Sequence, residues 1–340
     1  MKKLITISIT VLALSLASLL AISCGVDMDF SISSDDEPET ASIKLALDWY
    51  PNANHLGLFI AQQKGYFEEE NLDVTMYTPS DPSTVLQTVG AGQDDVGMSY
   101  QPDVLLARNE GVPVVSILGV VQHPLNSLMT LESSGITTPG QLAGKKVGYP
   151  GIPTNEPLLE TMLKADGLNG LEDIELVNIG WNISESLIGE KVDGVVGAYW
   201  THESINMQKI GYPVNVMRME EWGVPDYYEL VLVTSEDYLS ENEDVAERFV
   251  RAMKRGYEEA IGDPQAGVDV LVAANEGEID ESIDRPGADL LVPMWQLPSG
   301  GGFGTQEPAR WNSFVQWMKD NGMLDQSLDA SAAYRADIGN

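Results

Sequence analysis

IKLALDWYPNANHLGLFIAQQKG, residues 43–65, decides the fold that this sequence predicts. Its first seven residues form a short, mostly apolar strand, and the part that begins with ANHLG has apolar residues at Leu56, Phe59 and Ile60, on one helix face. Gly65 ends this helix, because glycine adopts positive φ without a steric cost. A strand that leads directly into a helix is the repeating unit of α/β proteins with a parallel sheet.

Strand and helix patterns go on alternating through two series along the chain. In the first series VPVVSILGVV, residues 112–121, is continuously apolar, as strands buried on both faces of a parallel sheet are. The chain then becomes strongly helical, and its last clear helix, over 306–322, has Trp311, Phe314 and Met318 on one face. We therefore predict an α/β protein with two lobes and a mostly parallel sheet in each, whose late helices return to cover one lobe. The predicted strands lie at 43–49, 72–79, 94–100, 112–121, 127–131, 145–151, 174–180, 194–200, 213–219 and 229–235.

The N-terminal residues have the pattern of an export signal followed by a tether. Two lysines precede the apolar residues 4–20, and AISC follows, so residues 1–23 are predicted to be a signal peptide. AISC resembles the cleavage box of bacterial lipoproteins, which implies that Cys24 carries a lipid; the alternative is an ordinary small residue in a signal that is cut elsewhere. Ser, Asp and Glu predominate in residues 24–42, which cannot bury enough apolar surface to fold and are predicted to be an acidic tether.

Composition excludes several classes of partner and site. The sequence has 19 Lys and Arg against 52 Asp and Glu, a net charge of −33, so no basic surface is expected to bind nucleic acid. This charge is that of a solubility surface and says little about the ligand. Cys24 is the only cysteine of the sequence, so neither a disulfide within the chain nor a thiolate metal site is expected. SGGGFG at 299–304 lacks the strand and helix that flank a dinucleotide-binding loop.

Polar and aromatic residues gather where predicted strands end, which is where open α/β sheets bind ligands. Each has a structural alternative: Asn54 is a candidate helix cap, His55 a hydrogen-bonding residue at a helix start, and Trp200 a packing residue. The recurrence of such clusters in both lobes favours a ligand site. The clusters are Asp48, Trp49, Asn52, Asn54 and His55; Ser99, Tyr100 and Gln101; Pro150 to Thr154; Tyr199, Trp200, His202 and Glu203; and Trp222, Tyr227, Tyr228 and Glu229.

Five blocks of the sequence resemble the solute-binding lipoproteins of bacterial thiamine-pyrimidine ABC importers, which recognise formylaminopyrimidine from degraded thiamine. The resemblance runs from about residue 43 to beyond residue 311. The first block is shared with related riboflavin-binding proteins and with eukaryotic thiamine-pyrimidine synthases, whereas GYPGIP, GAYW and EWGVPDYYE favour the pyrimidine binders. The blocks are LDWYPNANHLGLFIAQQKGYFEEENLDV, MSYQPDVLLARNEGVPVVSILGVVQHPLNSLM, GKKVGYPGIPTNE, VDGVVGAYWTHE and EEWGVPDYYELVLV.

This resemblance implies a two-lobed periplasmic-binding-protein fold of type II. Lobe I is expected over 43–125 and 232–340, and lobe II over 126–231, with crossovers near 122–128 and 228–231. We expect a monomer without cofactor, metal or catalytic activity. Anchored by Cys24 outside the membrane, or periplasmic, it would deliver an aminopyrimidine to the permease subunits of an ABC importer in the cytoplasmic membrane.

The strand-end clusters and the resemblance together predict the ligand-binding residues. Aromatic faces suit a flat pyrimidine, and a carboxylate suits its amino group, so we predict that Glu203 accepts the amino N–H, with Asn52 and His55 fixing the orientation of the ligand. Trp49, Tyr199, Trp200 and Tyr227 are the candidates for stacking. The complete predicted set is Trp49, Asn52, His55, Tyr100, Gln101, Pro150, Tyr199, Trp200, Glu203 and Tyr227.

Three alternatives stay open at this point. The first keeps the fold and binds riboflavin or another flat heterocycle. An alkanesulfonate would need an anion clamp, and the strand-end clusters contain no arginine, although helix N-termini can bind anions. The last alternative is an iron-dependent pyrimidine synthase that consumes its own histidine, for which His55 stands in the matching block; a chain with three histidines and one cysteine is poorly equipped for it.

Overall fold

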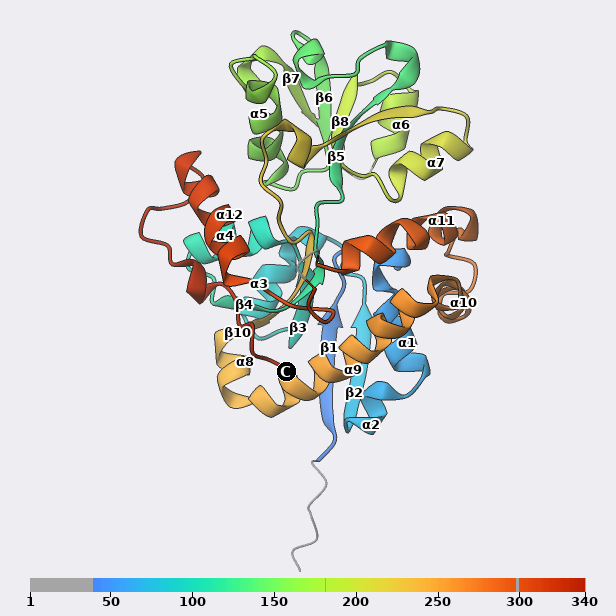
Figure 1. Ribbon diagram of the computed structural model, residues 1–340, viewed down its shortest axis with the longest axis vertical. Coiled ribbons are helices and arrows are strands. Elements are labelled where there is room, and N and C mark those ends of the chain that lie inside the picture. The colour runs from blue at the N-terminus through green and yellow to red at the C-terminus, as the bar shows by residue number, and fades with distance from the viewer. Residues whose placement is uncertain (1–38, 181, 298–299, 340) are drawn as a thin grey trace, which may run out of the picture. The chain divides into compact units, whose positions relative to one another are not determined.

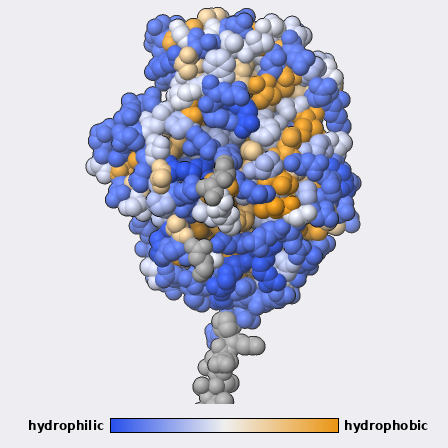
Figure 2. Space-filling view, viewed as in Figure 1, coloured by the Kyte–Doolittle hydropathy of each residue, from blue (hydrophilic) through white to orange (hydrophobic). Residues whose placement is uncertain are grey.

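The structure is a computed structural model that describes residues 39–180, 182–297 and 300–339 (Figure 1). The predicted signal peptide, Cys24 and nearly all of the predicted tether lie outside the described residues. Among the helices that the structure describes, none is both long and apolar enough to cross a membrane. On the face seen in Figure 2, hydrophilic residues predominate and hydrophobic ones are confined to patches, as the acidic composition leads one to expect.

The first sheet combines strands from the beginning and from the later part of the chain. Its order is β2-β1-β3-β10-β4; β1 pairs in parallel with β2 and β3, and β10 is antiparallel to β3 and β4. Four strands therefore share one direction, and β10 alone in this sheet is reversed. Its strands are β1 (Ala41–Ala46), β2 (Leu72–Tyr77), β3 (Val96–Ser99), β4 (Val114–Val121) and β10 (Leu230–Ser235).

The second sheet repeats this plan with the middle part of the chain. Its order is β7-β6-β8-β5-β9, in which β6 is parallel to β7 and β8, while β5 is antiparallel to β8 and β9. The α/β class with mostly parallel sheets is thus confirmed, with one reversed strand in each sheet. The strands are β5 (Asn126–Leu131), β6 (Lys146–Tyr149), β7 (Glu175–Asn178), β8 (Gly194–Tyr199) and β9 (Val214–Arg218), and the helices beside them are α5 (Asn155–Ala165), α6 (Ile183–Ile188) and α7 (Glu203–Lys209).

The reversed strands are those that enter from the other sheet. The chain leaves β4 at Val121 and starts β5 at Asn126, and it leaves β9 at Arg218 to start β10 at Leu230. Because a direct connection from one sheet enters the next at its facing edge, the incoming strand runs away from that edge, opposite to its neighbours. The carboxyl ends of the other strands of both sheets therefore meet at one boundary between the sheets.

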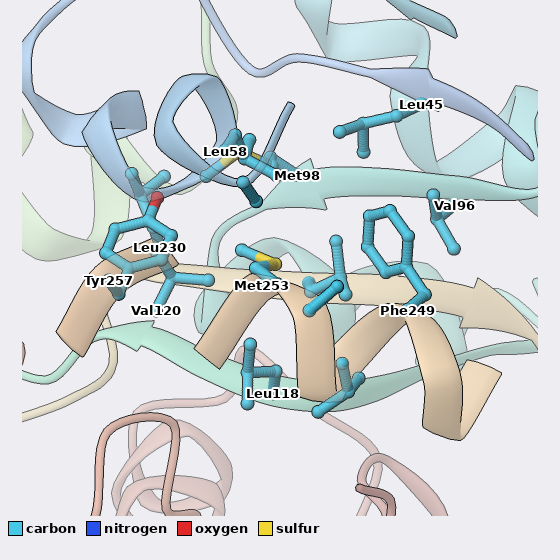
Figure 3. Close-up of a cluster of buried hydrophobic side chains, with 14 of the residues drawn as sticks. Leu45, Leu58, Val96, Met98, Leu118, Val120, Leu230, Phe249, Met253 and Tyr257 are labelled. Atoms are coloured by element: carbon cyan, nitrogen blue, oxygen red, sulfur yellow. The ribbon is translucent and has the colours of Figure 1, made fainter. Parts of the chain in front are cut away.

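Late helices cover the first sheet and complete its core (Figure 1). Phe249, Met253 and Tyr257 of α9 belong to the same buried cluster as strand residues Leu118 and Leu230 (Figure 3). Helix α9 packs closely against α1: a Cβ added to Gly256 would lie 2.0 Å from the carbonyl oxygen of Gly57. The helices beside this sheet are α1 (Leu56–Gln63), α2 (Tyr66–Glu69), α3 (Val85–Gly90), α4 (Gln101–Asn109), α8 (Glu236–Glu241), α9 (Glu243–Gly262), α10 (Pro264–Ala274), α11 (Glu281–Leu291) and α12 (Pro308–Asp320).

Candidate ligand-binding cleft

A pocket lies where the strand ends of the two sheets face each other. From the first sheet it receives residues that follow β1 and β3, including Trp49 and Tyr100. From the second sheet it receives Pro150, after β6, and Tyr199, at the end of β8. The structure therefore brings together seven of the ten predicted residues in the lining: Trp49, Asn52, Tyr100, Pro150, Tyr199, Glu203 and Tyr227.

Residues 48–55 form the wall of the pocket after β1, and their hydrogen bonds to one another make this segment a bracket. Asn52 caps the short 3-10 helix Ala53–His55, and its side-chain oxygen accepts the backbone N–H of Asn54 at 2.8 Å. His55 Nδ1 accepts the backbone N–H of Asn52 at 3.2 Å, so Nε2 carries the hydrogen that is donated to Asp48 Oδ1 at 3.0 Å. Both nitrogens of the His55 ring are thereby engaged, and the bracket holds Asp48 at the pocket.

Three predicted binding residues do not line the pocket. His55 is 0% exposed because its ring is enclosed in the bracket. Gln101 is also 0% exposed, and its side-chain oxygen accepts the backbone N–H of Tyr228 at 2.8 Å, which ties α4 to the second crossover. Trp200 donates its ring N–H to the carbonyl oxygen of Pro124, and the Arg218 guanidinium lies 4.7 Å from its ring. These three side chains hydrogen-bond to the segments that surround the pocket and do not form its lining.

The wall after β8 contains Glu203, the predicted acceptor for an amino group. Its Oε2 accepts the backbone N–H of Tyr199 at 2.7 Å, and its Oε1 lies 3.0 Å from His202 Nδ1. Burial lowers the pKa of His202, but Glu203, Asp284 of α11 and Asp280 just before that helix raise it to a value above normal. Glu203 lines the pocket with both carboxylate oxygens already in use, and His202 lines it beside Glu203.

Aromatic surface reaches the pocket from several elements. Trp49 packs edge-on against Tyr50, with ring centroids 6.2 Å apart. Burial raises the pKa of Tyr100, Tyr199 and Tyr227 well above the normal value, so these hydroxyls stay protonated. The pocket therefore combines flat apolar faces with neutral hydroxyl groups, a lining suited to a flat, polar-edged molecule.

Glu229 lines the pocket and was absent from the predicted binding residues, although its cluster was recognised. It is 3% exposed, and its Oε2 accepts the backbone N–H groups of Leu125 at 2.7 Å and Asn126 at 3.0 Å. Burial raises its pKa to about 7, against the lowering effect of these hydrogen bonds. The sequence places four acidic residues within ten positions here, and their spacing does not indicate which one is buried.

Two pocket-lining asparagines, Asn126 at the start of β5 and Asn155 at the start of α5, were also missed. Asn126 donates its amide N–H to Asn155 Oδ1 at 2.7 Å and accepts the backbone N–H of Gly197 at 2.9 Å. Gly197 has a φ of 94°, and a Cβ there would lie 2.7 Å from the ring of Pro150. The glycine within GVVGAY was the available signal, because a glycine inside a strand often marks a close approach of another group.

The charges around the pocket are acidic. Its described lining includes the carboxylates of Asp48, Glu203 and Glu229 and contains no lysine or arginine. An adjoining hollow shares Asp48 and Tyr100 with the pocket and adds Asp103, whose pKa burial raises to about 6. Within the part of the chain that the structure describes, no group of three or more His, Cys, Asp or Glu side chains is placed to hold a metal ion. This arrangement suits a ligand that donates hydrogen bonds.

Comparison with known proteins gives one family and one fold. The family model described as NMT1/THI5 like matches residues 52–267. A formylaminopyrimidine-binding protein of Halalkalibacterium halodurans is 36% identical over 331 residues, covering 96% of this chain and 98% of that protein. A 4-amino-5-hydroxymethyl-2-methylpyrimidine phosphate synthase of Saccharomyces cerevisiae is 28% identical over 66% of this chain and 68% of its own length.

Solved structures agree on the fold. The alkanesulfonate-binding protein SsuA from Xanthomonas axonopodis pv. citri, bound to MOPS, superposes with a TM-score of 0.68 at 13% identity, covering 88% of this chain and 99% of its own. At that identity the similarity concerns the fold alone, and it confirms the two-lobed binding-protein architecture predicted from the sequence.

Proposed function

This chain belongs to the NMT1/THI5-like family, and from that premise we propose that it is a solute-binding protein for a formylaminopyrimidine-type precursor of thiamine. One observation carries the proposal: a pocket between the two sheets combines aromatic faces with carboxylates and has no lysine or arginine in its described lining. A flat aminopyrimidine offers a π face and N–H donors, which such a lining complements. The resemblance of nearly the whole chain to a formylaminopyrimidine-binding protein supports the same ligand class.

Binding would hold the two lobes together around the ligand. Trp49 and Tyr100 reach the pocket from the first lobe, and Tyr199 and Asn155 reach it from the second. A ligand that contacts both lobes at once stabilises the closed arrangement more than an open one, and so shifts the population toward closure. We propose that the permease of an ABC importer recognises this closed form and receives the ligand from it.

The proposed role is binding without chemistry. The synthase alternative needs a histidine that is open to the reaction, and His55 was the candidate. Its ring is completely buried, with one nitrogen held by the backbone of Asn52 and the other by Asp48. This arrangement favours a structural role for His55, and the relative that resembles the chain over nearly its whole length is a binding protein.

Calorimetry of the purified protein tests the ligand class. We expect formylaminopyrimidine to bind one molecule per chain, and riboflavin to bind at least tenfold more weakly, because the acidic lining matches N–H donors better than carbonyl acceptors. Native mass spectrometry of protein purified from its source identifies any ligand that travels with it. A yellow protein that carries flavin, with no heat of binding for any aminopyrimidine, would overturn the proposal in favour of the riboflavin alternative.

We also propose that the protein is exported and anchored by a lipid on Cys24. The support is in the sequence, since this residue and the preceding signal lie outside the described residues. Replacement Cys24→Ser would remove the thiol that bears the lipid. We expect the wild-type protein to fractionate with membranes and the variant to fractionate with soluble proteins; equal membrane association of both would contradict the anchor.

A further inference from the structure

The three carboxylates of the pocket differ in whether one of their oxygens lacks a donor from the protein. Asp48 uses both oxygens, because Oδ1 binds the His55 ring and Oδ2 accepts the Tyr100 hydroxyl at 3.3 Å. Glu203 likewise uses both, one for the backbone of Tyr199 and one for His202. Neither carboxylate has an oxygen that lacks a donor.

Glu229 uses a single oxygen for the protein. Its Oε2 accepts the two backbone N–H groups of Leu125 and Asn126 and the hydroxyl of Tyr227 at 3.1 Å. Its Oε1 has no donor at normal hydrogen-bond geometry among the described residues. The Tyr199 hydroxyl lies close enough to help lower the pKa of this carboxyl, and it likewise has no partner at normal geometry within the described residues. The Glu229 carboxyl group is 3% exposed, lines the pocket and has one oxygen without a donor. That oxygen is available to accept a hydrogen bond from a ligand.

We propose that Glu229 is the carboxylate that recognises the ring amino group of the ligand. Its Oε1 would accept the amino N–H, while its Oε2 accepts the backbone N–H groups of the first crossover. This rests on the proposed function and names the residue that carries its selectivity. Glu229 lies in the second crossover, and the N–H groups of Leu125 and Asn126 that it holds lie in the first. The ligand would therefore be held at the point where both crossovers are joined. The ligand class is a flat heterocycle with an exocyclic amino group.

The surroundings of Glu229 raise its pKa, so we expect the affinity for the ligand to depend on pH. The ionisable groups that interact with it are Tyr227 from its own segment, Tyr199 from β8 and Tyr100 at the start of α4; His202, whose pKa is raised above normal, lines the same pocket. Burial raises the pKa of Glu229 to about 7. Below that pH the empty site holds a proton that must leave before the carboxylate can accept an N–H. For a ligand that stays neutral, affinity should fall by up to about tenfold per pH unit below 7.

A cycle of two proteins and two ligands separates recognition from a purely structural role. Dissociation constants are measured by calorimetry at pH 8 for the wild type and for Glu229→Gln, with formylaminopyrimidine and with its analogue in which the ring amino group is replaced by hydrogen. We expect the wild type to prefer the amino ligand by about tenfold or more, the usual effect of a hydrogen bond to a charged group. In Glu229→Gln this preference should shrink to less than threefold. Glu132→Gln, exposed and outside the pocket, serves as the control and should keep the wild-type preference.

Each outcome decides a different claim. A Glu229→Gln protein that binds both ligands more weakly by the same factor would show that Glu229 only joins the two crossovers, and would overturn the inference. A wild type that binds neither ligand would refute the proposed function itself. If Glu229→Gln does not fold, the wild type still tests the inference at pH 8: it should bind the amino ligand about tenfold more tightly than the analogue, and equal affinity for the two ligands would overturn the inference.

Discussion

His55 belongs to the hydrogen-bonded segment that forms one wall of the pocket, although its own side chain does not line the pocket. Its two ring nitrogens connect the backbone of Asn52 to the carboxylate of Asp48, and its ring has no exposed surface. The polar residues of the opening motif therefore form one unit, in which the histidine orients the residues that reach the pocket. Because of this role, we expect a substitution of His55 to lower the stability of the protein more than its affinity for the ligand.

We expect His55→Ala to lower the free energy of unfolding by about 2–4 kcal/mol, because it leaves a buried Asp48 oxygen and a backbone N–H without partners. Urea unfolding measures this change, and calorimetry should show a loss of ligand affinity of no more than about tenfold. Asn52→Ala is the comparison, because Asn52 lines the pocket and caps the same turn. A His55→Ala protein of wild-type stability that has lost all binding would instead place His55 against the ligand.

The residue scale also marks the limit of what the sequence could predict. Strand ends located the pocket, because open α/β sheets bind ligands there, and seven predicted residues line it. Which residues face inward depends on tertiary contacts: Gln101 turns to the backbone of Tyr228, and Trp200 to the carbonyl of Pro124. Glu229 was missed because its burial results from hydrogen bonds to a segment about a hundred residues away.

At the scale of elements, periodic patterns predicted the helices well. The stripe of Trp311, Phe314 and Met318 is buried along α12, as the apolar spacing of that helix indicated. The reversed direction of β5 and β10 could not be read from their sequences, because antiparallel and parallel strands that are buried on both faces are equally apolar. Direction depends on the connection, and thus on which sheet the chain has just left.

The contact between α1 and α9 provides a test at the scale of elements. Gly256→Ala would place a Cβ 2.0 Å from the backbone oxygen of Gly57, so one helix must move away from the other. We expect a loss of about 1–3 kcal/mol in the free energy of unfolding, the usual cost of overpacking a core. Gly262→Ala, at the end of the same helix with nothing within 4 Å of the added Cβ, is the control and should be neutral or slightly stabilising. Equal stability of both variants in urea unfolding would show that α1 and α9 can accommodate a methyl group at position 256 without a cost in stability.

At the scale of the whole folded part, the two lobes touch beside the pocket as well as through the crossovers. Helix α11 of the first lobe approaches the segment before α7 of the second, and a Cβ added to Gly287 would lie 2.8 Å from the carbonyl oxygen of Thr201. Beside this contact Lys209 Nζ lies 2.5 Å from Asp280 Oδ2. Gly287 is outside the pocket lining, so we expect a substitution there to affect the proposed lobe closure and to leave the lining residues unchanged.

We expect Gly287→Ala to weaken ligand binding by about 1–3 kcal/mol, because the closed arrangement must accommodate the added methyl group whereas an open one need not. The free energy of unfolding without ligand should change less than the free energy of binding, since opening the lobes relieves the contact. Lys209→Ala removes the neighbouring exposed ion pair and should cost less than about 1 kcal/mol, which makes it the matched control. Small-angle scattering should show that ligand compacts the wild type and compacts Gly287→Ala less. Wild-type affinity in Gly287→Ala would mean that the lobes close without bringing α11 against Thr201.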